Sequence, residues 1–169
     1  MSVGDGPTVV IGVGNTFRRD DGAGPEVAAR LRDQAFPGVT VVTLDGEPTA
    51  LVEAWAGAAL AIVVDALVCQ PPRPGRIHRV ATPMTPRSGM SVATHGLGVA
   101  EAVRLASALD RLPRTLVLLG VEAADVGIGP GLSPPVAAAV PALVHAVMTE
   151  LASACGTFDP MAVPARGPS

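Results

Sequence analysis

The feature that most constrains the fold is a set of short apolar runs rich in β-branched residues, each ending at a glycine or an acidic residue. Runs this short are typical of strands that are buried on both faces of a sheet. Between them lie longer segments whose apolar residues recur every three or four positions, as they do in helices with one buried side. The predicted strands are Thr8–Val13, Val39–Leu44, Leu60–Val64 and Thr115–Val121. The predicted helices are Gly22–Gln34, Pro48–Ala58, Leu97–Leu109 and Pro134–Ala154.

The alternation of strands and helices predicts an α/β fold, arranged as a three-layer α/β/α sandwich. Arg76–Ala81 alternates polar and apolar residues, which is the pattern of a strand with one solvated face. Only the proline-rich loop Cys69–Gly75 separates it from the strand before it, whereas a parallel neighbour needs a crossover of about a dozen residues or more. We therefore expect a five-stranded, mostly parallel sheet with one antiparallel edge strand.

The length of 169 residues suits one compact domain. We expect this domain to span residues 1–155. Residues 156–169 contain three prolines and two glycines and have little to bury, so we expect them to form a flexible C-terminal tail.

Composition excludes several function classes. All 12 basic residues are arginine, so the chain has no lysine for a Walker A motif, a Schiff base or a Ser-Lys dyad. The net charge is -3, and the only basic run is Arg18-Arg19. A nucleic-acid partner is therefore not expected.

The sequence predicts a cytoplasmic protein without a membrane span. The longest uncharged apolar run, Ala54–Val64, is too short for a span of about 20 residues. The segment Met1–Gly6 has no basic region typical of a signal peptide. Cys69 and Cys155 lack the CxxC spacing and are interpreted as reduced thiols.

Polar groups follow the predicted strands where these end, which is the edge at which α/β sheets bind their ligands. They are Asn15, Asp20, Asp21, Asp45, Asp65 and Glu122. We expect Asp20 to cap the helix that follows it. A carboxylate at Asp65, after a buried strand, is costly unless it is paired, metal-bound or open to a cleft.

His95 lies in the sequence THGLG, just before a predicted helix. The glycines beside it leave the imidazole uncrowded. Asp21, Asp65 and His95 would together give two carboxylates and an imidazole, a plausible donor set for a borderline divalent metal. His78 and His145 are interpreted as structural.

Two other kinds of chemistry are less well supported by the residues. Gly12 and Gly14 begin a GxGxxG pattern, but Phe17 occupies the third glycine position and the acidic pair that follows would repel a pyrophosphate. The two glycines are better explained by a tight exit from the first strand. Cys69 could act as a nucleophile paired with His95, although its proline-rich loop supplies no oxyanion helix. No GxSxG motif supports a serine hydrolase.

Five segments, in this order and spacing, resemble the nickel-iron hydrogenase maturation endopeptidases. They are GVGNTFRRDDGAG, LDGEPT, VVDAL, THGLG and GVEAADVGIGPGLSPPVAAAVPAL. The resemblance runs from about Thr8 to about Leu151. It implies a phosphorylase/hydrolase-like fold with a five-stranded mixed sheet between helices.

The resemblance also implies an activity and a site. Members of this family remove a C-terminal extension from the hydrogenase large subunit after nickel insertion. Their metal-contacting residues fall on Asp21, where some members have glutamate, and on Asp65 and His95. The nickel is expected mainly on the substrate, with weak or no binding to the free enzyme. The residues expected to support the site or contact substrate are Asn15, Asp20 and Asp45.

The expected partner is therefore the nickel-iron hydrogenase large-subunit precursor, bound by a monomer. Two alternatives stay open. One is a non-catalytic checkpoint or chaperone protein that binds the nickel-loaded subunit. The other is a Rossmann-like domain that binds a small ligand.

Overall fold

The fold is built on one five-stranded sheet with the strand order β2-β1-β3-β5-β4. The computed structural model describes residues 6–81 and 97–155. Four strands are parallel, and β4 pairs antiparallel with β5 at one edge, as expected. The strands are β1 (Thr8–Val13), β2 (Val39–Leu44), β3 (Leu60–Leu67), β4 (Ile77–Ala81) and β5 (Thr115–Glu122).

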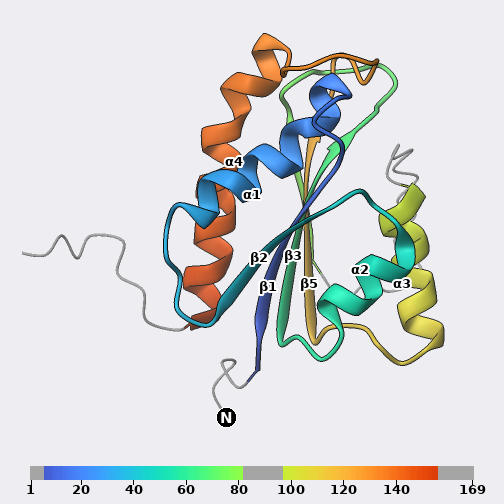
Figure 1. The fold of residues 1–169 in the computed structure, drawn as a ribbon, viewed down its shortest axis with the longest axis vertical. Helices are drawn as coiled ribbons and strands as arrows, with labels where there is room; N and C mark the ends of the chain where they lie inside the picture. Colours follow the sequence, from blue (N-terminus) through green and yellow to red (C-terminus); the bar gives the residue numbers. More distant parts are fainter. Residues whose placement is uncertain (1–5, 82–96, 156–169) are drawn as a thin grey trace, which may run out of the picture.

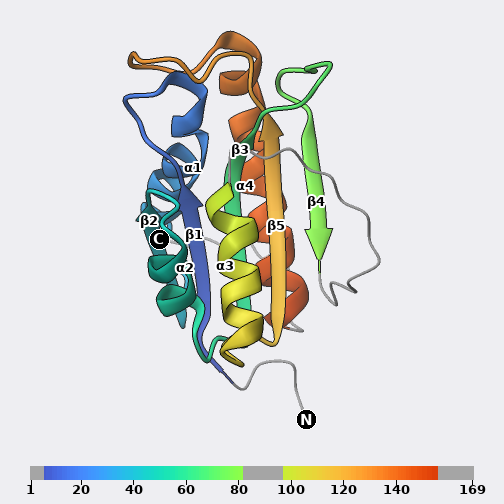
Figure 2. The same cartoon turned by 90° about the vertical axis from the view of Figure 1, so that its right-hand side faces the viewer.

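Helices cover both faces of the sheet and give the predicted three layers (Figures 1 and 2). On one face lie α1 (Ala23–Arg32) and α4 (Pro134–Cys155), and on the other lie α2 (Pro48–Trp55) and α3 (Leu97–Ala108). Each face has its own core: Val27, Leu31 and Leu143 are fully buried on the first. The second core is centred on Leu51 and Trp55. Burying a side chain of this size stabilises the fold by about 1.5–3 kcal/mol, so the two aliphatic cores hold the sheet rigidly between the helices.

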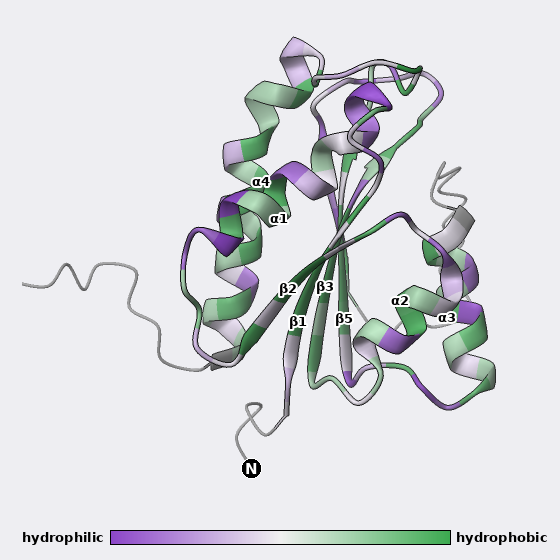
Figure 3. Cartoon of the chain, in the orientation of Figure 1, coloured by the Kyte–Doolittle hydropathy of each residue, from purple (hydrophilic) through white to green (hydrophobic). Residues whose placement is uncertain are grey.

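The central strands carry mostly hydrophobic colour in Figure 3, while the turn after β1 is hydrophilic. That turn contains a short 3-10 helix, η1 (Arg19–Gly22), where the sequence predicted an acidic loop followed by a helix from Gly22. At the top of Figure 1 it lies beside the loop that follows β5, although the two segments are about a hundred residues apart in the chain. The sheet thus brings its polar loops together at the carboxyl edge.

The third strand is longer than its apolar run predicts. Leu60–Val64 was expected to end before Asp65, but β3 continues to Leu67 because its pairing with β5 continues to Leu67 and Glu122. Asp65 therefore lies inside a buried strand, opposite Gly120, and does not follow it.

Helix α4 is the one segment among the described residues that is long and apolar enough to cross a membrane, by length and composition alone. The expectation that no segment reaches this length was therefore wrong. In the fold, Val136, Val140 and Leu143 of α4 are buried in the core beside α1. Core helices of soluble proteins pass the same test, so the finding is weak support for a membrane span.

Candidate active site

A cleft of about 140 Å³ opens at the carboxyl edge of the parallel strands. It lies where sheets of this type bind ligands. Its walls come from the loops after β1, β2 and β5, from β3 and from the start of α3. The lining residues are Val13, Gly14, Arg18, Asp21, Asp45, Gly46, Asp65, Gly98, Val99 and Val126. Three of the predicted acidic residues, Asp21, Asp45 and Asp65, are thus brought to one cleft.

Asp65 is the most deeply placed of these carboxyl groups, with 8% of its surface exposed. Its Oδ1 accepts a hydrogen bond from the backbone N–H of Ala66 at 2.8 Å. Burial raises the pKa of Asp65 to about 7; the Ala66 hydrogen bond lowers it, and the negative charge of Asp21 raises it further. A pKa near neutrality is typical of groups that can act as a general acid or base.

Asp21 faces the same cleft from η1 and is held by the turn that precedes it. Its Oδ2 accepts a hydrogen bond from the Asn15 backbone N–H at 2.9 Å, while Asn15 Oδ1 accepts one from the Phe17 N–H at 2.9 Å. Gly14 makes this turn possible: its φ is +144°, and a Cβ there would lie 1.8 Å from the Asp21 carbonyl oxygen. The backbone of Asn15 thus fixes the Asp21 carboxylate, and the tight strand exit predicted at Gly14 is confirmed.

Asp45 lies at the exposed rim of the cleft, where its Oδ1 accepts a hydrogen bond from the Glu47 N–H at 3.1 Å. The next residue, Gly46, touches the start of α3, because a Cβ on Gly98 would lie 1.8 Å from the Gly46 carbonyl oxygen. The first turn of α3 is therefore packed directly against this wall of the cleft. His95 precedes that helix in the sequence but lies outside the described residues, so its predicted role stays a prediction.

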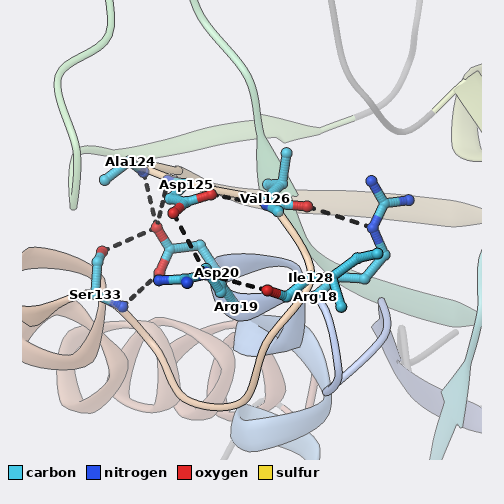
Figure 4. A network of polar contacts seen from close by, with 9 residues as sticks. Arg18, Arg19, Asp20, Ala124, Asp125, Val126, Ile128 and Ser133 are labelled. Atoms are coloured by element: carbon cyan, nitrogen blue, oxygen red, sulfur yellow. Dashed lines mark hydrogen bonds and ion pairs between the residues drawn. The ribbon is translucent and has the colours of Figure 1, made fainter.

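Asp20 does not line the cleft, and its predicted role as a helix cap is wrong. Neither η1 nor α1 has a hydrogen bond to a capping side chain. Asp20 is fully buried, and its carboxylate instead accepts hydrogen bonds from the loop that follows β5 (Figure 4). The donors are Ala124 N (2.8 Å), Asp125 N (3.0 Å), Ser133 N (2.7 Å) and Ser133 Oγ (2.9 Å).

These bonds decide the ionisation of Asp20. Burial alone would raise its pKa, but the hydrogen bonds from Ser133, Asp125 and Ala124 outweigh it and lower the pKa. Backbone pairing reinforces the contact, since Arg19 N donates to Gly129 O at 2.9 Å and Asp20 N donates to Asp125 O at 3.0 Å. Asp20 therefore fixes the loop after β5, which also carries the lining residue Val126.

Glu122 also departs from expectation, because it is not among the residues that line the cleft. It is buried beside β4, where its carboxylate contacts His78 Nε2 and Arg73 N, each at 2.6 Å. The sequence analysis missed this pairing. The register could have revealed it, because His78 lies opposite Gly120, two residues before Glu122 on the same face.

Comparisons with known proteins agree with this architecture. Residues 25–150 match the family model described as hydrogenase maturation protease. The matched range includes Asp65 and His95, while Asp20 and Asp21 precede it.

Two relatives carry the name hydrogenase expression/formation protein HupD. The one from Bradyrhizobium diazoefficiens is 31% identical over 137 residues, which cover 78% of this chain and 71% of that protein. The one from Thiocapsa roseopersicina is 29% identical over 126 residues, which cover 72% of this chain. The match spans only 57% of the length of the Thiocapsa protein.

Solved structures show the same fold. The hydrogenase maturating endopeptidase HybD from Escherichia coli matches with a TM-score of 0.71 and 24% identity, over 87% of this chain and 93% of that one. The [NiFe] hydrogenase maturation protease HybD from Thermococcus kodakarensis matches with a TM-score of 0.68 and 21% identity, over 85% of this chain and 98% of that one. Taken with the family match, these findings show that the chain belongs to the hydrogenase maturation protease family, which is a family of peptidases.

Proposed function

We propose that this protein is an endopeptidase that removes a C-terminal extension from the large subunit of a nickel-iron hydrogenase after nickel insertion. The observation that carries the proposal is that Asp21 and Asp65 line one open cleft at the carboxyl edge of the sheet, in a chain of this family. The substrate is the large-subunit precursor, cleaved in the cytoplasm by a monomer.

The cleft suits the recognition of a metal that the substrate already holds. Asp21, Asp65 and His95 would contact the substrate's nickel through two carboxylate oxygens and one imidazole nitrogen. This set contains no thiolate and is partly open, so the free protein should bind nickel weakly and the metal should arrive with the precursor. With a pKa of about 7, Asp65 is close to half protonated at neutral pH, and contact with the cation would favour its ionised form.

Cleavage then needs a water molecule as the simplest attacking group. Polarised by the metal or by one of the carboxylates, the water adds to the carbonyl carbon of the peptide bond. The carbon–nitrogen bond breaks, the leaving amine takes up a proton, and the products are a carboxylate and a free amine. Contact with the nickel fixes which peptide bond lies close enough to react.

The charge of the cleft argues against the Rossmann-like alternative. Three aspartates line it against a single cation, Arg18, among the described lining residues. A pyrophosphate would meet carboxylates where dinucleotide sites present backbone N–H groups. A metal-bearing peptide suits this cleft better than a nucleotide does.

Exposed apolar side chains beside the cleft fit a protein substrate. Phe17 and Ile128 are 74% and 88% exposed. Their segments are joined by the bond from Gly129 N to Phe17 O, and the neighbouring Arg18 and Val126 line the cleft. Exposed apolar groups next to a site are suited to packing against a folded partner.

We expect cleavage to require nickel in the precursor. Nickel-loaded precursor incubated with the protein should lose a C-terminal fragment, whereas precursor stripped of nickel should stay intact, because the metal positions the scissile bond. Mass spectrometry of the precursor reads out both reactions. A nickel-loaded precursor that binds but keeps its full mass would instead support the checkpoint alternative. Efficient cleavage of stripped precursor would contradict nickel recognition.

We expect Cys69→Ala to cleave the precursor at a rate within a few-fold of the unmodified protein. Burial and the neighbouring Glu122 carboxylate raise the pKa of the Cys69 thiol, although Arg76 opposes them. A neutral thiol is a poor nucleophile, and Cys69 is not among the residues that line the cleft. Single-turnover assays would test this expectation. A loss of about 10³-fold or more in a folded variant would indicate covalent catalysis through Cys69 instead.

A further inference from the structure

We propose that Cys69, His78 and Glu122 form a second metal site, separate from the cleft, that binds Zn²⁺ or a similar divalent transition metal. One sulfur, one ring nitrogen and one carboxylate oxygen from these residues all lie within 4.8 Å of one another. None of the three lines the cleft. The inference concerns these residues alone and does not depend on the proposed peptidase activity.

The sheet itself brings the three residues together. His78 lies on β4 opposite Gly120, and Glu122 lies two residues further along β5 on the same face. Leu67 at the end of β3 pairs with Glu122, and Cys69 follows two residues later. His78 and Glu122 are held by paired strands, which place donor atoms more precisely than a free loop does, whereas Cys69 lies in the loop just after β3.

Glu122 gives the cluster its negative charge. Its side chain is only 4% exposed, and its Oε1 lies 2.6 Å from His78 Nε2. The backbone N–H of Arg73 donates to its Oε2 at 2.6 Å. Both oxygens of this buried carboxyl group thus have a hydrogen-bonding partner, and Oε1 is the one that faces His78. A buried carboxylate gains from a cation beside it.

The donor set matches the preferences of zinc. Zn²⁺ takes cysteine sulfur at about 2.3 Å and histidine nitrogen or carboxylate oxygen at about 2.0–2.2 Å, usually in a tetrahedron. The donors of such a site lie roughly 3.3–3.6 Å apart, a spacing that follows from those bond lengths. The ligand atoms of the three residues lie within 4.8 Å of one another, and the His78–Glu122 contact of 2.6 Å would have to lengthen for both side chains to bind the same ion.

The chemistry of binding is a proton exchange. Cys69 is a half-buried free thiol, and the metal must displace its proton to form the metal–sulfur bond. Three protein ligands leave the fourth position for water, as in zinc sites that are not purely structural. The half-buried Cys69 and His78 give a metal ion access from solvent.

Cobalt titration of the reduced, metal-free full chain would test the site. We expect Co²⁺ to produce thiolate-to-cobalt charge-transfer absorption that saturates at one equivalent and is removed by Zn²⁺. Cys69→Ser should abolish this absorption, and Glu122→Gln should weaken the affinity by at least about 10–100-fold, the range found when only an outer-shell partner of a ligand is lost. Cys155→Ser is the matched control, because it removes the other cysteine and should leave the absorption unchanged. Asp21→Asn should also leave it unchanged, because the cleft is separate.

A second measurement keeps the test valid if Cys69→Ser folds poorly. Zinc should raise the melting temperature of the unmodified protein and of Asp21→Asn, but not that of His78→Gln. Absence of thiolate absorption in the unmodified protein would overturn the site. Absorption that persists in Cys69→Ser or disappears in Cys155→Ser would also overturn the site. Absorption that never saturates would do the same, because it would indicate adventitious binding only.

Discussion

Replacing Asp65 by asparagine is expected to abolish precursor cleavage while making the protein more stable above pH 7. Asparagine keeps the shape of the side chain but removes a carboxylate that faces the cleft. If Asp65 contacts the substrate's nickel or the attacking water, cleavage should fall by about 10³-fold or more, as in other enzymes that lose a group acting on the reacting atoms. Single-turnover cleavage of nickel-loaded precursor measures this loss.

The stability gain follows from the buried charge. The pKa of Asp65 is raised to about 7 in the folded protein, against about 3.9 in an unfolded chain. The folded state therefore holds an extra proton between these two values, and the free energy of unfolding falls as the pH rises through this range. Asparagine has no charge to bury, so the variant should not share this decline. Its melting temperature should exceed that of the unmodified protein at about pH 8 by more than it does at about pH 5.

Two further variants separate this prediction from general effects of losing a carboxylate. Asp21→Asn should also lose cleavage, and it should lower the pKa of Asp65 because the charge of Asp21 helps to raise it. Asp33→Asn, an exposed carboxylate at the end of α1, should change neither activity nor the pH dependence. Retained cleavage by Asp65→Asn would remove Asp65 from the site. An equal stability change at both pH values would contradict the buried charge.

Most of the fold could be predicted because the central strands β1, β3 and β5 are largely buried and the helices between them have one apolar side. β1 and β2 end where their apolar runs end, and the short Cys69–Gly75 loop left β4 no room for a parallel crossover. The end of β3 could not be read in the same way. The apolar run in the sequence stops at the polar Asp65 and so predicts that the strand ends there. The strand continues to Leu67, because its hydrogen bonding to β5 continues that far.

The part of the site that could be predicted is the set of acidic residues near the carboxyl ends of the parallel strands. Asp21 and Asp65 meet because carboxyl ends of parallel strands share an edge. The roles of Asp20 and Glu122 depend on partners far away in the sequence: Asp20 bonds Ser133, 113 positions later, and Glu122 bonds His78, 44 positions earlier. No local periodicity encodes such pairings, so Asp20 was expected at a helix cap and the partner of Glu122 was not predicted.

The distant contacts of Asp20 predict a large loss of stability in Asp20→Ala. The substitution leaves the N–H groups of Ala124, Asp125 and Ser133 without their acceptor, next to a new void. Leaving buried donors unpaired costs about 1–3 kcal/mol for one group and more where a charged acceptor is lost. We expect a loss of about 3 kcal/mol, which in a chain of this length lowers the melting temperature by roughly 6–12 °C. Calorimetry at neutral pH measures the difference.

Asp125→Ala is the matched control for this loss. Asp125 lies in the same loop and is also a carboxylate, but its contacts are exposed: an ion pair with Arg19 at 3.4 Å and a hydrogen bond from the Gly127 N–H at 2.7 Å. An exposed pair of this kind contributes less than about 1 kcal/mol, so the control should melt close to the unmodified protein. Similar losses in both variants would show that the loop, and not the buried carboxylate, limits stability.

At acid pH, the melting temperatures of Asp20→Ala and of the unmodified protein should become more similar. The pKa of Asp20 is lowered in the folded state, because the hydrogen bonds from the loop outweigh the effect of burial. The ionised carboxylate thus contributes its stability above the unfolded pKa of about 3.9, and the contribution is lost as the pH falls through the lower folded value. The gap in melting temperature should be constant between about pH 5 and pH 7 and should shrink below about pH 4. A gap that persists unchanged in acid would mean that Asp20 supports the loop through packing, without its charge.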